Sequence, residues 1–190
     1  MTTDAMRTIA ALEARLAALE GAEAARRTMA RYMALCDVPS GALDGEALER
    51  LFTADAVWEG IGPHYTSKFG RIEGRAAIVA MLARYLPPEP HFATNVHFLT
   101  SGSIDMVTPA RAKGRWIMLQ ASGYVDERAE LIGARLEVDF VPAPDGSDAS
   151  DAAGWLIAHF RTERLFDAPW RVSPRPAPSL PPAAPAARPD

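Results

Sequence analysis

The hydrophobic pattern of this chain changes its period once, close to residue 90, and this change limits the possible folds. Before it, apolar residues recur every three or four positions, as in amphipathic helices. After it, four segments alternate with a period of two, namely residues 91–100, 111–123, 132–142 and 155–167. No gap between these segments is long enough for a crossover helix, so the four strands are expected to be antiparallel.

The part of the chain before residue 90 is expected to be mainly helical. Residues 4–20 carry a narrow apolar stripe, typical of a helix that packs on a partner helix or a neighbouring subunit; the stripe consists of Met6, Ile9, Leu12, Leu16 and Leu19. Gly21 is expected to end this helix. A second helix is expected over about residues 22–36, because Pro39 and Gly41 follow it. A short helix, a short strand, a loop and a further helix are then expected at residues 44–52, 56–59, 60–71 and 74–86.

Helices followed by an antiparallel run of strands predict an α+β fold. We expect a cone-shaped domain, in which a curved antiparallel sheet wraps around the N-terminal helices and leaves a cavity between them. The expected organisation is an N-terminal amphipathic helical arm at residues 1–21, the α+β cone at residues 22–172, and a Pro/Ala-rich tail at residues 173–190. The seven prolines of the tail exclude a helix or a central strand there.

Charge and cysteine content narrow the classes of partner. The formal net charge of −4 argues against nucleic acid or an anionic membrane as a partner, and no apolar run approaches the roughly 20 residues that span a bilayer. The single cysteine, Cys36, excludes an internal disulfide and fits a reducing cytoplasm. We expect a cytoplasmic protein with a small-molecule partner. The apolar stripe and the tail favour a homodimer or a homotrimer.

The strand that begins at residue 91 carries an unusual polar row. In a regularly alternating strand His91, Asn95 and His97 share one face, with small or apolar residues between them, as in the wall of a pocket. His91 and His97 would then lie about 20 Å apart, at roughly 3.3 Å per residue. We therefore expect one residue of the row to take part in chemistry and the others to line or support the site.

Asp37 is the second residue of interest, because it directly follows the second predicted helix. Unpaired carbonyls and the helix dipole disfavour an anion at that place. This suits a functional carboxylate, although a solvated loop aspartate fits the same position. Asp37 and His91 can both reach the cavity if the helix packs across the cone. His64, in a glycine-rich loop, is expected to be a surface residue.

Several catalytic classes are excluded by missing motifs. The sequence has no Gly-x-Gly-x-x-Gly, no Gly-Lys-Ser/Thr loop and no Gly-x-Ser-x-Gly elbow. No cysteine or histidine spacing matches a zinc site, so no metal ligands are assigned. An aspartate and a histidine without a nucleophile or a metal suit proton abstraction next to a leaving group, as in eliminations, isomerisations and aldol-type cleavages.

Four stretches resemble the SnoaL-like branch of the nuclear transport factor 2-like superfamily, and the resemblance covers about residues 10–170. They are the end of the first long helix, Arg-Tyr-Met-Ala-Leu-Cys-Asp at 31–37, and residues 44–59, 72–78 and 91–95. Scytalone dehydratase, bile acid 7α-dehydratase and hexachlorocyclohexane dehydrochlorinase belong to this superfamily and use an Asp–His dyad. Asp37 and His91 match the two places of that dyad, and Tyr32 matches a tyrosine of the bile acid enzyme. The further histidine or aspartate of two of these lyases would fall near Trp116 and is missing here.

The resemblance implies a cofactor-independent lyase that acts on a hydroxylated aromatic or polycyclic small molecule, by dehydration or by an aldol-type, formaldehyde-releasing cleavage. His91 would be the general base, Asp37 would orient it, and Tyr32 would donate to the departing or carbonyl oxygen. The expected substrate-binding residues are Asn95, Trp116, Trp58, Arg161 and Met33. Two alternatives stay open: a polyketide cyclase or ketosteroid-type isomerase with Asp37 as base and Tyr32 as donor, and a non-catalytic small-molecule-binding member.

Overall fold

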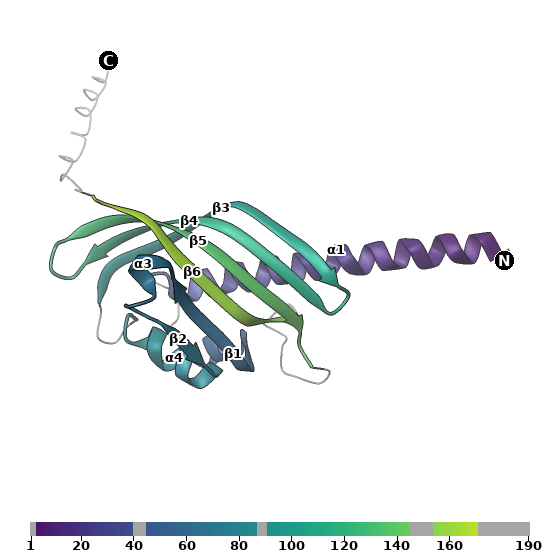
Figure 1. The fold of residues 1–190 in the computed structure, drawn as a ribbon, viewed down its shortest axis with the longest axis horizontal. Helices are drawn as coiled ribbons and strands as arrows, with labels where there is room; N and C mark the ends of the chain where they lie inside the picture. The colour runs from purple at the N-terminus through teal and green to yellow at the C-terminus, as the bar shows by residue number, and fades with distance from the viewer. Residues whose placement is uncertain (1–2, 40–44, 87–90, 145–153, 171–190) are drawn as a thin grey trace, which may run out of the picture.

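The computed structural model describes residues 3–39, 45–86, 91–144 and 154–170. A long helix comes first, short helices and strands follow, and four long strands complete the fold (Figure 1). The elements are α1 (Thr3–Cys36), α2 (Gly45–Glu49), β1 (Phe52–Ile61), α3 (Gly62–Tyr65), β2 (Arg71–Glu73), α4 (Arg75–Ala83), β3 (Phe92–Thr108), β4 (Arg111–Tyr124), β5 (Ala129–Pro142) and β6 (Trp155–Pro169).

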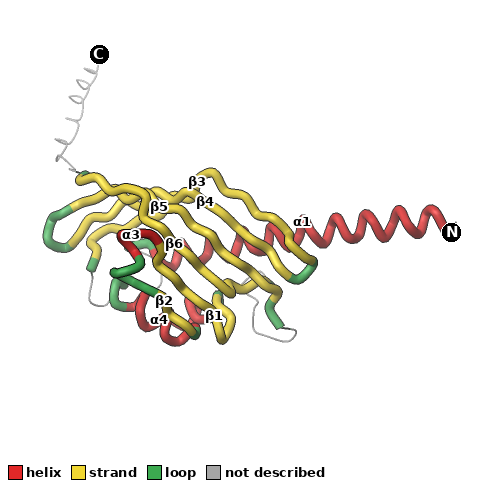
Figure 2. The backbone as a smooth tube through the Cα atoms, in the orientation of Figure 1, coloured by secondary structure: helices red, strands yellow, loops and turns green. Residues whose placement is uncertain are grey.

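The six strands form one sheet in the order β2-β1-β6-β5-β4-β3. Strands β3 to β6 pair with their sequence neighbours in antiparallel fashion, as predicted. β1 pairs with β6 in parallel, so the sheet is mixed. Figures 1 and 2 show it as a curved, unclosed layer that arches over the second half of α1. The predicted α+β fold with a curved sheet around the N-terminal helix is confirmed.

The first helix is continuous, so the predicted break at Gly21 is wrong. Gly21 lies where α1 first meets the sheet, and a Cβ there would come within 3.0 Å of the Trp155 ring and 3.1 Å of Met106 Cε. A glycine in a helix interior lowers the stability by about 1 kcal/mol relative to alanine, but here it allows a close approach to the sheet.

Before Gly21 nearly every residue is exposed, and this half of α1 projects beyond the sheet (Figure 1). Among the described residues, no helix is both long and apolar enough to cross a bilayer.

The second half of α1 packs on the concave face of the sheet. Ala25 and Met29 are fully buried there, together with Phe140 and Ile157 of β5 and β6. Thr28 fixes the crossing point, because its Oγ1 donates to the backbone oxygen of Trp155 at 2.7 Å. Each large apolar side chain buried in this way contributes roughly 1.5–3 kcal/mol to the stability. The helix end, and with it Asp37, is therefore held rigidly against the sheet.

The segments between α1 and β3 contain more regular structure than the sequence predicted. The short strand expected at 56–59 is the ten-residue β1. The loop expected at 60–71 contains α3, and at its end begins β2, which pairs with β1. The predicted Pro/Ala tail at 173–190 lies outside the described residues.

A β-bulge interrupts the start of β3. Phe92 pairs with Tyr124 and Thr94 pairs with Gly123, so β3 has one extra residue between two consecutive partners on β4. One extra residue moves the following side chains to the other face of the strand. The regular alternation that places His91 in phase with Asn95 and His97 therefore fails at this point.

Candidate functional site

Asp37 is the first residue beyond α1, and a backbone bridge places it beside β3. Its amide donates to Met33 O at 3.0 Å, which continues the helical pattern by one residue. The next residue, Val38, exchanges two backbone hydrogen bonds with Asn95, at 2.7 and 2.8 Å. The end of the helix is thus tied to the first part of the strand that carries the polar row.

The carboxylate of Asp37 binds His97. Its Oδ1 accepts the backbone N–H of His97 at 3.0 Å and lies 2.7 Å from His97 Nδ1. An ionised carboxylate can only accept, so Nδ1 carries the proton and, in the neutral ring, Nε2 keeps its lone pair. The His97 side chain is 9 % exposed and that of Asp37 is 29 % exposed. The pair is an imidazole held in one tautomer by a partly buried carboxylate.

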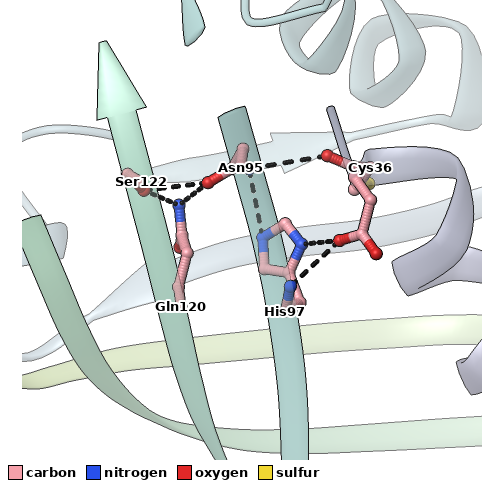
Figure 3. Close-up of polar contacts among 6 residues, drawn as sticks. Cys36, Asn95, His97, Gln120 and Ser122 are labelled. Atoms are coloured by element: carbon pink, nitrogen blue, oxygen red, sulfur yellow. Dashed lines mark hydrogen bonds and ion pairs between the residues drawn. The ribbon is translucent and has the colours of Figure 1, made fainter. Parts of the chain in front are cut away.

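Asn95 fixes the other side of the His97 ring (Figure 3). Its Oδ1 accepts hydrogen bonds from Gln120 Nε2 and Ser122 Oγ, both at 2.8 Å. Two donors on the oxygen orient the amide, so its Nδ2 points to Cys36 O and to His97 Nε2, each at 3.5 Å. Because Nδ2 is a donor, this contact agrees with an unprotonated His97 Nε2.

Of this group, Cys36, Asn95, His97 and Gln120 lie in the wall of a cavity of about 140 Å³, whereas Asp37 and Ser122 contact them from outside the lining. A cavity of roughly 150 Å³ in another protein holds one benzene ring. The lining residues are Tyr32, Met33, Cys36, Trp58, Tyr65, Lys68, Phe69, Met81, Leu82, Tyr85, Leu86, His91, Phe92, Asn95, His97, Met118, Gln120, Tyr124, Ile132, Leu136, Phe160 and Thr162. Most are apolar or aromatic; β3 and β4 contribute the polar side chains of Asn95, His97 and Gln120, and the segment after α3 contributes Lys68.

The aromatic residues pack on one another around the cavity. Trp58 and Phe160 stack with their ring centroids 5.7 Å apart and an angle of 11° between their planes. Phe69 meets Trp58 edge to face at 5.2 Å, and Tyr32 packs on Phe160 at 5.0 Å. Such pairs hold their rings in fixed positions. The cavity therefore offers a rigid aromatic surface for a planar ligand.

Tyr32 is buried in this wall and stays protonated. Its oxygen accepts a hydrogen bond from Trp58 Nε1 at 3.2 Å. Burial raises the pKa of the Tyr32 hydroxyl well above its ordinary value, and the neighbouring Cys36 thiol raises it further. Burial likewise raises the pKa of Cys36 to about 12. Both groups are neutral at ordinary pH, so Tyr32 keeps its O–H proton.

Among the described residues, His97 and not His91 contacts Asp37, which corrects the predicted pairing. His91 precedes the bulge and lies at the edge of the cavity, exposed, with its ring against Tyr85, Phe92 and Tyr124 at 4.6 to 5.3 Å. The bulge brings Phe92 onto the cavity wall with Asn95 and His97. The prediction treated β3 as regularly alternating and so chose the wrong histidine for this contact.

Two of the predicted substrate-binding residues lie outside the cavity lining. Trp116 shares the concave face with Met118 but is buried farther along β4 against Phe140, at 6.3 Å. Arg161 lies on the opposite face of β6 from Phe160, where it pairs with Glu137 at 3.2 Å. Arg161 is directly adjacent to Phe160 and Thr162, which line the cavity, and neighbouring residues of a strand face opposite sides. Asn95, Trp58 and Met33 lie in the cavity lining, and their role in substrate binding stays a prediction.

Sequence reasoning missed several residues of the site. Gln120 and Ser122 were recognisable as polar residues on one face of β4, but their link to Asn95 depends on the register between β3 and β4. Tyr65, Lys68 and Phe69 belong to the loop-like segment between β1 and β2, whose fold gave no signal. Within the described part of the chain, no three His, Cys, Asp or Glu side chains lie close enough together to hold a metal ion.

Comparison with solved structures identifies the fold. An NTF2-like protein with a cystatin-like fold from Novosphingobium aromaticivorans is 26 % identical over 81 % of this chain and 88 % of its own, with a TM-score of 0.59. A hexachlorocyclohexane dehydrochlorinase (LinA type 2) is 15 % identical over 87 % and 99 %, with a TM-score of 0.67. A scytalone dehydratase-like protein from N. aromaticivorans is 19 % identical over 83 % and 92 %, with a TM-score of 0.63.

Comparison of sequences identifies the family. No curated protein matches this chain. The pattern of the SnoaL-like domain matches residues 17–173, which includes the second half of α1, the whole sheet and the cavity. On this match, the chain belongs to the SnoaL-like domain family.

Proposed function

We propose that this protein is a cofactor-independent lyase that acts on a hydroxylated aromatic small molecule, with His97 as its general base. The observation that carries the proposal is the 2.7 Å contact between Asp37 Oδ1 and His97 Nδ1, in the wall of an aromatic cavity. The family match and the likeness to a dehydrochlorinase and a scytalone dehydratase-like protein support the same reaction class.

The proposed reaction is an elimination. His97 Nε2 takes a proton from a substrate carbon, and the electron pair of that C–H bond becomes the new double bond. The bond to the leaving hydroxyl on the adjacent carbon breaks, and the oxygen departs as water after receiving a proton from the imidazolium. Asp37 stabilises the imidazolium during this step. Tyr32 donates a hydrogen bond to the departing oxygen. In an aldol-type cleavage the same base would take the hydroxyl proton, the O–H electron pair would form the new carbonyl as the C–C bond breaks, and the carbon that keeps the C–C electron pair would take a proton back from the imidazolium.

The isomerase alternative is less well supported by the same contacts. It needs Asp37 as the base, but Asp37 Oδ1 already accepts two short hydrogen bonds from His97, at 3.0 and 2.7 Å, whereas His97 Nε2 has, within the described chain, only the longer contact of 3.5 Å with Asn95 Nδ2. A non-catalytic binder is the other alternative, and it predicts ligand binding without turnover.

The test is turnover of a panel of hydroxylated aromatic compounds by the wild type and four variants. His97→Ala and Asp37→Asn are expected to lower kcat by about 10²- to 10⁴-fold, the usual contribution of a general base. His64→Ala is the matched control, because His64 is exposed and is not part of the cavity lining, and it is expected to retain full activity. His91→Ala is expected to raise KM more than it lowers kcat. If His97→Ala kept full activity and His91→Ala lost it, His91 and not His97 would be the general base. If the wild type bound the compounds but did not convert them, the protein would be a non-catalytic small-molecule binder.

A further inference from the structure

Lys68 is a cation in the lining of the cavity without a carboxylate partner. It follows α3, and its Nζ lies 5.1 Å from the centroid of the Phe69 ring, another lining residue. The structure gives Lys68 no ion pair among the described residues, although most of the other charged side chains form one. An ammonium group held over an aromatic ring at the cavity is free to bind a ligand.

A tyrosine hydroxyl, a second cation and the carboxylate of Glu130 lie near this ammonium group, and Glu130 partly offsets the effects of burial and of Arg164 on the Lys68 pKa. Tyr65 is buried and lines the cavity, and its hydroxyl has no hydrogen-bond partner in the described part of the chain. Burial raises the pKa of Tyr65, so the hydroxyl keeps its proton. Burial lowers the pKa of Lys68, and the charge of Arg164 lowers it further, which indicates that the two cations lie close together.

The nearby carboxylates are engaged by Arg164. Glu130 Oε2 lies 3.5 Å and Asp167 Oδ2 lies 3.2 Å from Arg164 Nη2. Glu130 also accepts the hydroxyl proton of Tyr124 at 3.0 Å. These contacts leave Lys68 Nζ and the Tyr65 hydroxyl without an acceptor among the described residues, as they also leave the Tyr85 hydroxyl and Arg164 Nε.

Lys68 and His97 line the same cavity but come from segments near opposite edges of the sheet. Lys68 comes from the segment beside β1 and β6, because α3 contacts those strands, whereas His97 lies on the edge strand β3. Three strands, β6, β5 and β4, separate β1 from β3. A ligand that fills the cavity therefore meets a base at one end and a cation at the other.

We propose that Lys68 and Tyr65 bind a carboxylate on the substrate, at the end of its aromatic ring that faces away from His97. This rests on the proposed function only in taking the cavity as the substrate site. It narrows the substrate class from hydroxylated aromatics in general to aromatic acids.

The chain offers a direct test, because it contains only two lysines, Lys68 and Lys113. Lys113 pairs with Asp139 at 3.8 Å and is not part of the cavity lining, so it is a matched control. Reductive methylation with carbon-13 formaldehyde retains the charge of both side chains and makes each visible by NMR. The probes are benzoate and its neutral analogue benzamide, and variants Lys68→Met and Lys113→Met assign the signals.

Benzoate is expected to shift the Lys68 signal and to raise the pKa of Lys68, while the Lys113 signal stays in place. The wild type is expected to bind benzoate about tenfold more tightly than benzamide, as one charged hydrogen bond provides. Lys68→Met should bind both equally, and Lys113→Met should behave as the wild type. An unmoved Lys68 signal, or equal benzoate affinity in Lys68→Met and the wild type, would overturn the proposal. Binding is read without turnover, so failure of the His97 mechanism would leave this result intact, and the reverse also holds.

Discussion

Asn95 shows how one buried residue organises the polar side of the site. Its side chain is 3 % exposed, yet it contacts Cys36 O, His97, Gln120 and Ser122. Buried polar groups that lose a partner cost more than the hydrogen bond itself contributes. The amide is therefore fixed in one orientation, and this orientation presents a donor to His97 Nε2.

Removal of one donor to Asn95 tests this network. Ser122 is fully buried, and Ser122→Ala deletes its hydroxyl with little change of shape. We expect the free energy of unfolding to fall by about 1 kcal/mol, as for a typical buried hydrogen bond. Urea unfolding followed by circular dichroism measures it. Ser103→Ala on the exposed part of β3 is the control and is expected to change the stability by less than about 0.5 kcal/mol. Equal effects of the two substitutions would mean that the network does not hold Asn95.

At the scale of the element, α1 divides into a half that builds the core and a half that the described chain leaves uncovered. The apolar residues of its first half are 41 % to 69 % exposed; they are Met6, Ile9, Leu12, Leu16 and Leu19. The last four are spaced by three, four and three residues, as in a coiled-coil seam. We propose that this half of α1 packs against another copy of the chain in a homodimer or homotrimer.

Charged residues in the seam test this assembly. The double variant Leu12→Lys, Leu16→Lys is expected to sediment as a monomer in analytical ultracentrifugation, because like charges would face each other across the seam. The wild type is expected to sediment as a dimer or trimer. Ala14→Lys places one charge on the opposite face of the helix and should leave the assembly intact. A monomeric wild type, or a double variant with the wild-type mass, would argue against a role for this stripe.

At the scale of the whole molecule, the sequence predicted what depends on local periodicity. The alternating segments located β3 to β6, and Pro39 and Gly41 located the end of α1 just before Asp37. The contacts of β1 with β6 and the continuity of α1 through Gly21 depend on tertiary packing, which a local pattern does not contain. The prediction that Asp37 contacts His91 was wrong for a local reason. One bulge residue between Phe92 and Thr94 changes which residues of β3 share a face. The catalytic assignment is therefore the part of the prediction most sensitive to a single local irregularity.

The most direct test of the account is the position of the proton on the His97 ring, measured by nitrogen-15 NMR. The chain has four histidines, and the signals of His97 are assigned as those missing in His97→Gln. We expect neutral His97 to carry its proton on Nδ1, with Nε2 unprotonated, because Asp37 Oδ1 accepts from Nδ1 at 2.7 Å. Asp37→Asn should shift these signals and leave those of His64 unchanged. A proton on Nε2 of the neutral ring, or His97 signals that do not respond to Asp37→Asn, would contradict the proposed general base.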